Sequence, residues 1–304
     1  MSKQFIFVVL FLASIKIFAQ PYDPSKDKIE FIGDTPYSQE DLIKAELRTG
    51  MYLSAYTALT QNAITSPCDT LYDVDDTISG CNWSTLPWEH KRAVLNNVSG
   101  FPGCIVIATY KVRDCPYNPF IRQIKLVSYT TDFYIPGSNI GCDSLSTYLT
   151  SGNETDKNLK LQLLEEHLYR EISEFEAGDP AEFSFCDPSG NPTSNSIPRQ
   201  IFYREEPCKS KVLLEIEQAS AMHYLYVNVP CTTVTGCCKT WFTFCKDSLG
   251  NVVTHINKEP VGSNCNGYPT ELLVESIVNA FSNNPDFIGA IITPTLLPCK
   301  NTCN

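Results

Sequence analysis

Residues 231–245 read CTTVTGCCKTWFTFC and continue as KDSLGNVVTHI over residues 246–256. Four of the fourteen cysteines of this 304-residue chain fall in residues 231–245, and Cys237 and Cys238 are adjacent. Runs of β-branched and aromatic residues on both sides of a Gly-Asn pair predict two strands joined by a turn. We therefore expect a cross-linked β segment at the centre of the fold.

Residues 1–19 have the pattern of a secretory signal peptide. Lys3 precedes an apolar run over residues 5–13, and Ala19 is a small residue at the expected cleavage point. The run is shorter than the roughly 20 residues that a membrane-spanning helix needs, which makes a membrane anchor the weaker alternative. The sequence thus predicts a secreted, extracellular or periplasmic protein that is not inserted in a membrane after the signal is removed.

The chain is acidic. Loss of Lys3 and Lys16 with the signal leaves 21 of the 23 basic residues against 34 acidic ones, a net charge of about −13. Phosphate groups repel such a chain, so neither nucleic acid nor an anionic membrane surface is an expected partner. The hydrophobic fraction of 43% supports a folded core. No cofactor is expected.

The even number of cysteines, all of which follow the signal, predicts a disulfide framework in an exported protein. Adjacent cysteines are poorly placed to bond each other, so Cys237 and Cys238 are expected to bridge two different partners. A metal held by the cluster is the alternative, but its spacing does not match the paired C-x-x-C pattern of zinc sites. The expected disulfide residues are Cys68, Cys81, Cys104, Cys115, Cys142, Cys186, Cys208, Cys231, Cys237, Cys238, Cys245, Cys265, Cys299 and Cys303.

Hydrophobic periodicity predicts an α+β fold with antiparallel β-sheets and three to five helices, held by disulfides. Helices are expected at residues 38–50, 51–64, 87–98, 158–177 and 270–281. Strands outside the opening segment are expected at residues 29–33, 104–112, 120–129, 211–218 and 222–229. Gly, Ser and Asn over residues 135–157 indicate a loop or a boundary, which divides the mature chain into residues 20–150 and a Cys-rich part, residues 151–304.

Three strand ends place a cysteine at a turn: YKVRDC (residues 110–115), FSFC (183–186) and FTFC (242–245). The last two continue as DPSGN and KDSLGN. Because a helix is expected before each of the first two, the pattern would fit a twofold helix-plus-hairpin duplication.

One segment resembles a catalytic motif. LYDVDDTI, residues 71–78, is similar to the D-x-D-x-T motif of haloacid-dehalogenase-type phosphatases. The resemblance implies that Asp73 attacks phosphorus, that Asp75 is the general acid–base and that Mg²⁺ offsets their charge, with Thr77 completing the turn. However, Pro67 interrupts the strand that should precede the motif.

Two other interpretations of this acidic segment remain open. It could be a solvated loop stapled by Cys68 and Cys81. Alternatively, carboxylate oxygens could hold Ca²⁺ in an extracellular setting, and the residues would then be Asp69, Asp73, Asp75 and Asp76.

The sequence favours a binding or structural role over an enzyme. The four histidines match no metalloprotease or nucleophile-elbow motif and are expected to be surface or packing residues: His90, His167, His223 and His255. We therefore expect a secreted, disulfide-rich protein that binds or assembles outside the cytoplasm, with an extracellular protein, a glycan or a second copy as partner. The alternative is an exported Mg²⁺-dependent phosphatase-like hydrolase that uses Asp73, Asp75 and Thr77.

Overall fold

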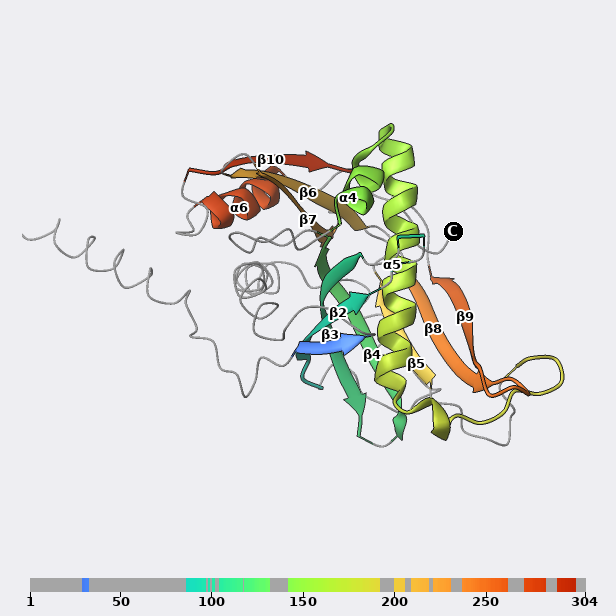
Figure 1. Ribbon diagram of the computed structural model, residues 1–304. Coiled ribbons are helices and arrows are strands. Elements are labelled where there is room, and N and C mark those ends of the chain that lie inside the picture. The colour runs from blue at the N-terminus through green and yellow to red at the C-terminus, as the bar shows by residue number, and fades with distance from the viewer. Residues whose placement is uncertain are drawn as a thin grey trace, which may run out of the picture.

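The computed structural model describes residues 29–32, 86–96, 98, 100–101, 104–116, 118–131, 142–191, 200–205, 209–218, 221–230, 237–261, 271–282 and 289–298. These residues form ten strands, three α-helices and a short 3₁₀ helix, η3 (Pro180–Glu182) (Figure 1). The strands are β1 (Ile29–Ile32), β2 (Glu89–Asn96), β3 (Ile105–Cys115), β4 (Asn118–Thr130), β5 (Gln200–Glu205), β6 (Lys209–Gln218), β7 (Ala221–Pro230), β8 (Cys237–Lys246), β9 (Val252–Val261) and β10 (Ile291–Leu296). The helices are α4 (Asp143–Thr150), α5 (Glu154–Ala177) and α6 (Glu271–Ser282).

The strands belong to one sheet that branches at β4. Residues 121–124 of β4 pair with β5, which leads on to β8 and β9, whereas residues 128–130 pair with β7, which leads on to β6 and β10. Among the described pairs, only β1–β2 and β4–β5 are parallel. The fold is therefore α+β with a mainly antiparallel sheet, as the sequence predicts.

Strands β6 and β7 separate two hydrophobic cores. Successive side chains of a strand point to opposite faces of the sheet. Accordingly, Val212 and Leu214 of β6 pack with Ile277 of α6, whereas Leu213 of β6 and Tyr226 of β7 join the larger core. The alternation explains how two neighbouring strands support α6 on one side and the larger core on the other.

Helix α5 crosses the sheet and covers the larger core (Figure 1). Its expected apolar stripe is buried from Leu161 to Ile172, although Phe175 is 37% exposed. The Asn153 side chain accepts a hydrogen bond from Asp156 N (3.0 Å) at the start of the helix. Gly178 ends it with a φ of 96°, a conformation that glycine adopts easily.

The expected helix at residues 87–98 is wrong, because residues 89–96 form strand β2 between β1 and β3. Ala93, Val94 and Leu95 are all at most 1% exposed, so both faces of this strand are covered. A short apolar run of this kind does not distinguish a buried strand from a buried helix by its periodicity. Backbone pairing with β1 on one side and with β3 on the other makes this segment a strand.

Residues 143–150, which were expected to be part of a loop, form helix α4. The Cys142 sulfur accepts a hydrogen bond from Leu145 N (3.4 Å) at the start of this helix, and a disulfide joins Cys142 to Cys104. Leu145 and Leu149, one turn apart, are buried against the larger core. This helix has only eight residues and contains several Ser and Thr residues, so its sequence shows little helical pattern.

The twofold helix-plus-hairpin duplication is not confirmed, because its first helix is strand β2. The helices expected at residues 38–64 lie outside the described residues, so the total of three to five helices remains a prediction. The division after residue 150 also remains a prediction. Within the described residues, no helix is long and apolar enough to cross a membrane.

Candidate functional site

The residues of the phosphatase and calcium hypotheses lie outside the described residues: Asp69, Asp73, Asp75, Asp76 and Thr77, with Cys68 and Cys81. Both hypotheses therefore remain predictions. The same holds for the two bridges expected at Cys237 and Cys238, whose backbone forms the start of β8 but whose side chains are not described.

Two disulfides are present among the described residues. Cys104 is joined to Cys142 and Cys186 to Cys245, with Cα–Cα distances of 4.9 and 5.1 Å. Cys115 is also disulfide-bonded. The first bridge connects the chain before β3 to α4, and the second connects the FSFC segment to β8. Cys245 has no exposed surface. However, β8 and β9 lie at one end of the sheet order and not at the centre of the fold, where the sequence placed this segment.

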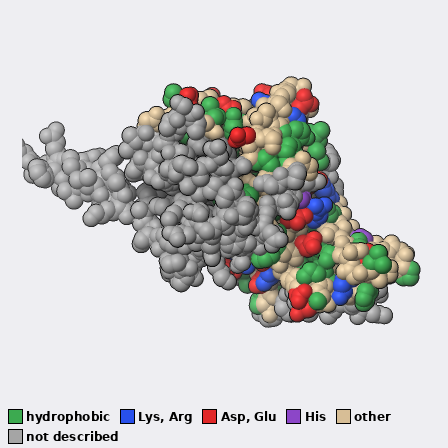
Figure 2. Space-filling model, viewed as in Figure 1, with side chains coloured by type: hydrophobic (Ala, Val, Ile, Leu, Met, Phe, Trp, Pro, Cys, Tyr) green, Lys and Arg blue, Asp and Glu red, His purple; other side chains and the backbone are tan. Residues whose placement is uncertain are grey.

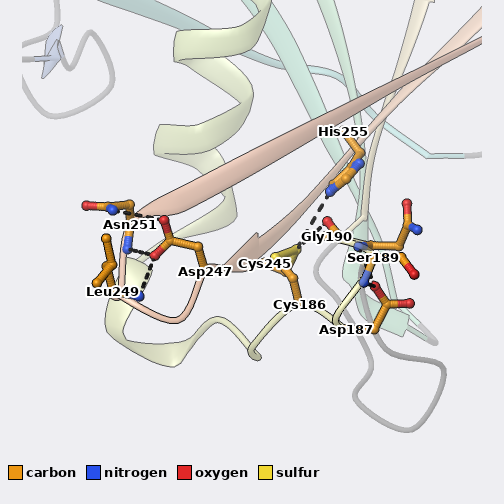
Figure 3. Close-up of a disulfide and its surroundings, with 10 residues drawn as sticks. Cys186, Asp187, Ser189, Gly190, Cys245, Asp247, Leu249, Asn251 and His255 are labelled. Atoms are coloured by element: carbon orange, nitrogen blue, oxygen red, sulfur yellow. Dashed lines mark hydrogen bonds between the residues drawn. A yellow bond between two sulfur atoms is a disulfide. The ribbon is translucent and has the colours of Figure 1, made fainter.

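The second disulfide lies between two loops of the same design, residues 187–191 and 247–251 (Figure 3). In each loop the Asp side chain accepts hydrogen bonds from the backbone N–H groups two and four residues later, at 2.8 or 2.9 Å. The Gly residues have φ angles of 85° and 86°. Hydrogen bonds from Asn251 lower the pKa of Asp247. The likeness of DPSGN and KDSLGN in sequence is therefore a likeness in structure.

A pocket of about 390 Å³ lies beside α5, between α4, the chain that follows β2, and Ile256 of β9. Hydrophobic side chains gather on the surface over α4 and the adjoining part of α5, and basic and histidine side chains lie next to them (Figure 2). Three large apolar side chains of the pocket lie at its surface: Tyr148 is 40%, Leu163 54% and Ile256 45% exposed. Covering this apolar surface with a ligand would remove it from water.

Lys160 fixes one wall of the pocket. Its Nζ donates hydrogen bonds to Tyr148 O (2.9 Å), Ser151 O (3.0 Å) and Ser151 Oγ (2.9 Å), and lies 4.5 Å from the centre of the Tyr148 ring. These three oxygen atoms carry no formal charge. The ammonium therefore joins α5 to the end of α4 while its positive charge remains beside the pocket.

His167 and Arg170 form the polar side of the pocket. Arg170 donates to His167 Nδ1 (3.0 Å) and to Glu171 Oε1 (3.0 Å). Burial lowers the pKa of His167; the Glu171 carboxylate acts in the opposite direction, and Arg170 adds to the lowering. Because a guanidinium can only donate, Nδ1 must be the acceptor, and the neutral ring carries its proton on Nε2. His167 thus offers one N–H donor.

The charged side chains that line the pocket carry more positive than negative charge. Glu166 forms an ion pair with Lys258 and ties α5 to β9. The other charged residues that line the pocket are Lys160 and Arg170. Together with Glu166 they give the lining an excess of one positive charge in an acidic protein.

Sequence reasoning did not identify this pocket. His167 was expected to be a surface or packing residue, and α4 was expected to be a loop. One residue in the sequence could have indicated the pocket: Leu163, an apolar residue of α5 outside the buried stripe, lines it. Comparisons with protein-family models, curated proteins and solved structures found no match.

Proposed function

We propose that the protein is an exported, disulfide-stabilised binding protein, and that the pocket beside α5 binds a small amphipathic anion. The exposed apolar side chains Tyr148, Leu163 and Ile256 around the pocket carry this proposal. A soluble protein that exposes apolar surface around a cavity commonly uses it for binding. The pattern of residues 1–19 and the cysteine content support export.

The charges of the pocket support an anionic ligand. Arg170 and the Nε2–H of His167 can donate to a carboxylate or sulfonate, while the excess positive charge disfavours a cation. The volume of about 390 Å³ fits one small molecule. A neutral glycan fits less well, because the Lys160 ammonium already covers one face of the Tyr148 ring on which a sugar would stack.

Two fluorescent probes of similar apolar structure test the ligand class: anilinonaphthalene sulfonate, an anion, and N-phenylnaphthylamine, which is neutral. We expect the wild-type protein to bind the anion more tightly. Arg170→Gln should weaken binding of the anion by about three- to tenfold and leave the neutral probe unchanged, because the half-exposed guanidinium is only partly screened.

Lys157→Gln is the matched control, because it removes the same charge from α5 at a residue that does not line the pocket. Equal affinity for the two probes, or equal losses in the two variants, would contradict a pocket that recognises anions. Far-UV circular dichroism of each variant confirms that the fold is retained.

The hydrolase alternative rests on the sequence motif at Asp73 and Asp75 alone. Its test is Mg²⁺-dependent hydrolysis of an aryl phosphate by the wild type and by Asp73→Asn. Activity that the substitution abolishes would support the phosphatase, and equal rates would remove it.

A further inference from the structure

We propose that Cys186, Cys245 and His255 form a redox-gated metal site. The disulfide closes this site in the oxidised protein, and two-electron reduction converts it into a Cys₂His site for a thiophilic divalent cation such as Zn²⁺. The proposal is independent of the pocket beside α5, which lies on other residues.

The register of the β8–β9 hairpin places the histidine beside the disulfide. Cys245 pairs with Val253 and Thr243 pairs with His255, so Cys245 and His255 are diagonal neighbours on one face of the hairpin. His255 Nε2 lies 3.8 Å from Cys245 Sγ, and the three ligand atoms all lie within 4.8 Å of one another. Figure 3 shows the His255 ring directed at the bridge.

The distance between His255 and Cys245 suits a tetrahedral metal site, and the two sulfur atoms, which are bonded in the disulfide, must move apart to about 3.8 Å after reduction. With Zn–S bonds of about 2.3 Å and Zn–N bonds of about 2.0 Å, a tetrahedral ion holds its S and N ligands about 3.5 Å apart. The observed S–N distance of 3.8 Å is close to this value. Two thiolates and an imidazole match the soft and borderline ligands that Zn²⁺ prefers, and water can take the fourth position.

Exposure determines where reduction begins. Cys186 is partly exposed and Cys245 is fully buried, so a dithiol reductant attacks Cys186 Sγ and the Cys245 thiolate leaves. The second thiolate of the dithiol then displaces Cys186, and the dithiol closes to its own disulfide. Two electrons pass to the protein pair. Zn²⁺ then binds both thiolates, and any protons that they carried are released to solvent.

The surrounding structure can hold the ligands together after the S–S bond opens. Cys186 N donates to Lys246 O and Lys246 N donates to Ser184 O, both at 2.7 Å, so backbone bonds keep the two segments side by side. The loops at residues 187–191 and 247–251 are fixed by their own Asp side chains. The metal would therefore replace the disulfide as the link between two ordered segments.

The test is protection of individual cysteines from alkylation. The protein is reduced with dithiothreitol, freed of reductant without oxygen, incubated with Zn²⁺ and pulsed with iodoacetamide, and peptide mass spectrometry gives the rate at each cysteine. We expect Zn²⁺ to slow alkylation of Cys186 and Cys245 by about tenfold or more in the wild type and by less than about twofold in His255→Gln. No protection, or equal protection in the variant, would overturn the proposal.

A second variant decides the matter if the reduced chain loses its circular dichroism. Cys186→His leaves the Cys245 thiol beside two imidazoles while every other bridge stays oxidised. We expect Co²⁺ to produce a thiolate-to-cobalt absorption band in this variant but not in the double variant that also carries His255→Gln. Absence of the band in the single variant would overturn the site.

Discussion

Leu159 and Leu163 show how single residues of α5 differ in role. Both are 54% exposed and both lie outside the buried stripe, but only Leu163 lines the pocket. One turn further, His167 is partly buried beside the same pocket and accepts a hydrogen bond from Arg170. At this scale the pocket depends on residues that helical periodicity alone assigns to the solvent-facing side.

The pKa of His167 makes a prediction about stability against pH. Because burial lowers this pKa below the ordinary value of 6.5, the unfolded chain binds the proton more readily than the folded protein. The histidine's contribution to stability is therefore complete above pH 6.5 and is lost as the pH falls from there through the lower folded value. Urea unfolding at a series of pH values should show a steeper fall for the wild type than for His167→Gln.

The unfolding experiment must separate the effect of His167 from the effects of its charged neighbours. Glu171 and Arg170 act on it from the same helix. Burial raises the pKa of Glu174 above its ordinary 4.5, and Glu171 adds to the effect. The contribution of this carboxyl to stability is therefore complete below pH 4.5 and is lost as the pH rises through the higher folded value, which is the opposite of the histidine. The difference between wild type and His167→Gln isolates the histidine. Parallel curves over the pH range below 6.5 would contradict the assignment.

At the scale of elements, a buried carboxylate holds the end of α5 on the sheet. The Glu176 side chain is 2% exposed and accepts hydrogen bonds from Tyr110 Oη (2.6 Å), Arg122 (2.7 Å) and Lys91 (3.1 Å). These partners belong to β3, β4 and β2. Such a network stabilises the packing only while all its members are present, because removal of one member leaves the buried polar groups around it without their partner.

Glu176→Ala should therefore lower the free energy of unfolding by about 3–5 kcal/mol, because it leaves two cations and a hydroxyl without their carboxylate. Tyr110→Phe should cost about 1 kcal/mol, since one hydrogen bond is lost. Asp114→Ala is the control: Asp114 pairs with Arg122 on the exposed side and should contribute less than about 1 kcal/mol. Equal effects of Glu176→Ala and Asp114→Ala in urea unfolding would refute this ranking.

The elements also show what the sequence can predict. Helix α5 was predicted correctly because its buried stripe has the helical period, and strands β6 and β7 were predicted correctly although Val212, Leu213 and Leu214 bury both faces of β6. β2 was mistaken for a helix, because Ala93, Val94 and Leu95 are buried on both faces and show no period. α4 was missed because it is short, and burial of Leu145 and Leu149 together with the Cys104–Cys142 bridge stabilises it more than its composition indicates.

At the scale of the whole molecule, long-range pairing decides where the pocket forms. The branch at β4 sends β5, β8 and β9 to one side, and this brings Ile256 of β9 to a helix almost a hundred residues earlier in the chain. No local pattern contains that information, because strand order depends on pairing between distant segments. The predicted site at Asp73 and Asp75 was based on a local motif, and nothing in the described fold tests it.

Leu163 lines the pocket and Leu159 does not, so these two residues test whether the pocket is the binding site. Titration of anilinonaphthalene sulfonate into Leu163→Asp and Leu159→Asp compares two equally exposed positions that receive the same charge. We predict that Leu163→Asp weakens binding by about tenfold or more, because it adds a carboxylate and removes apolar contact, and that Leu159→Asp changes it by less than about twofold. Equal affinities of the two folded variants would contradict the assignment of the site.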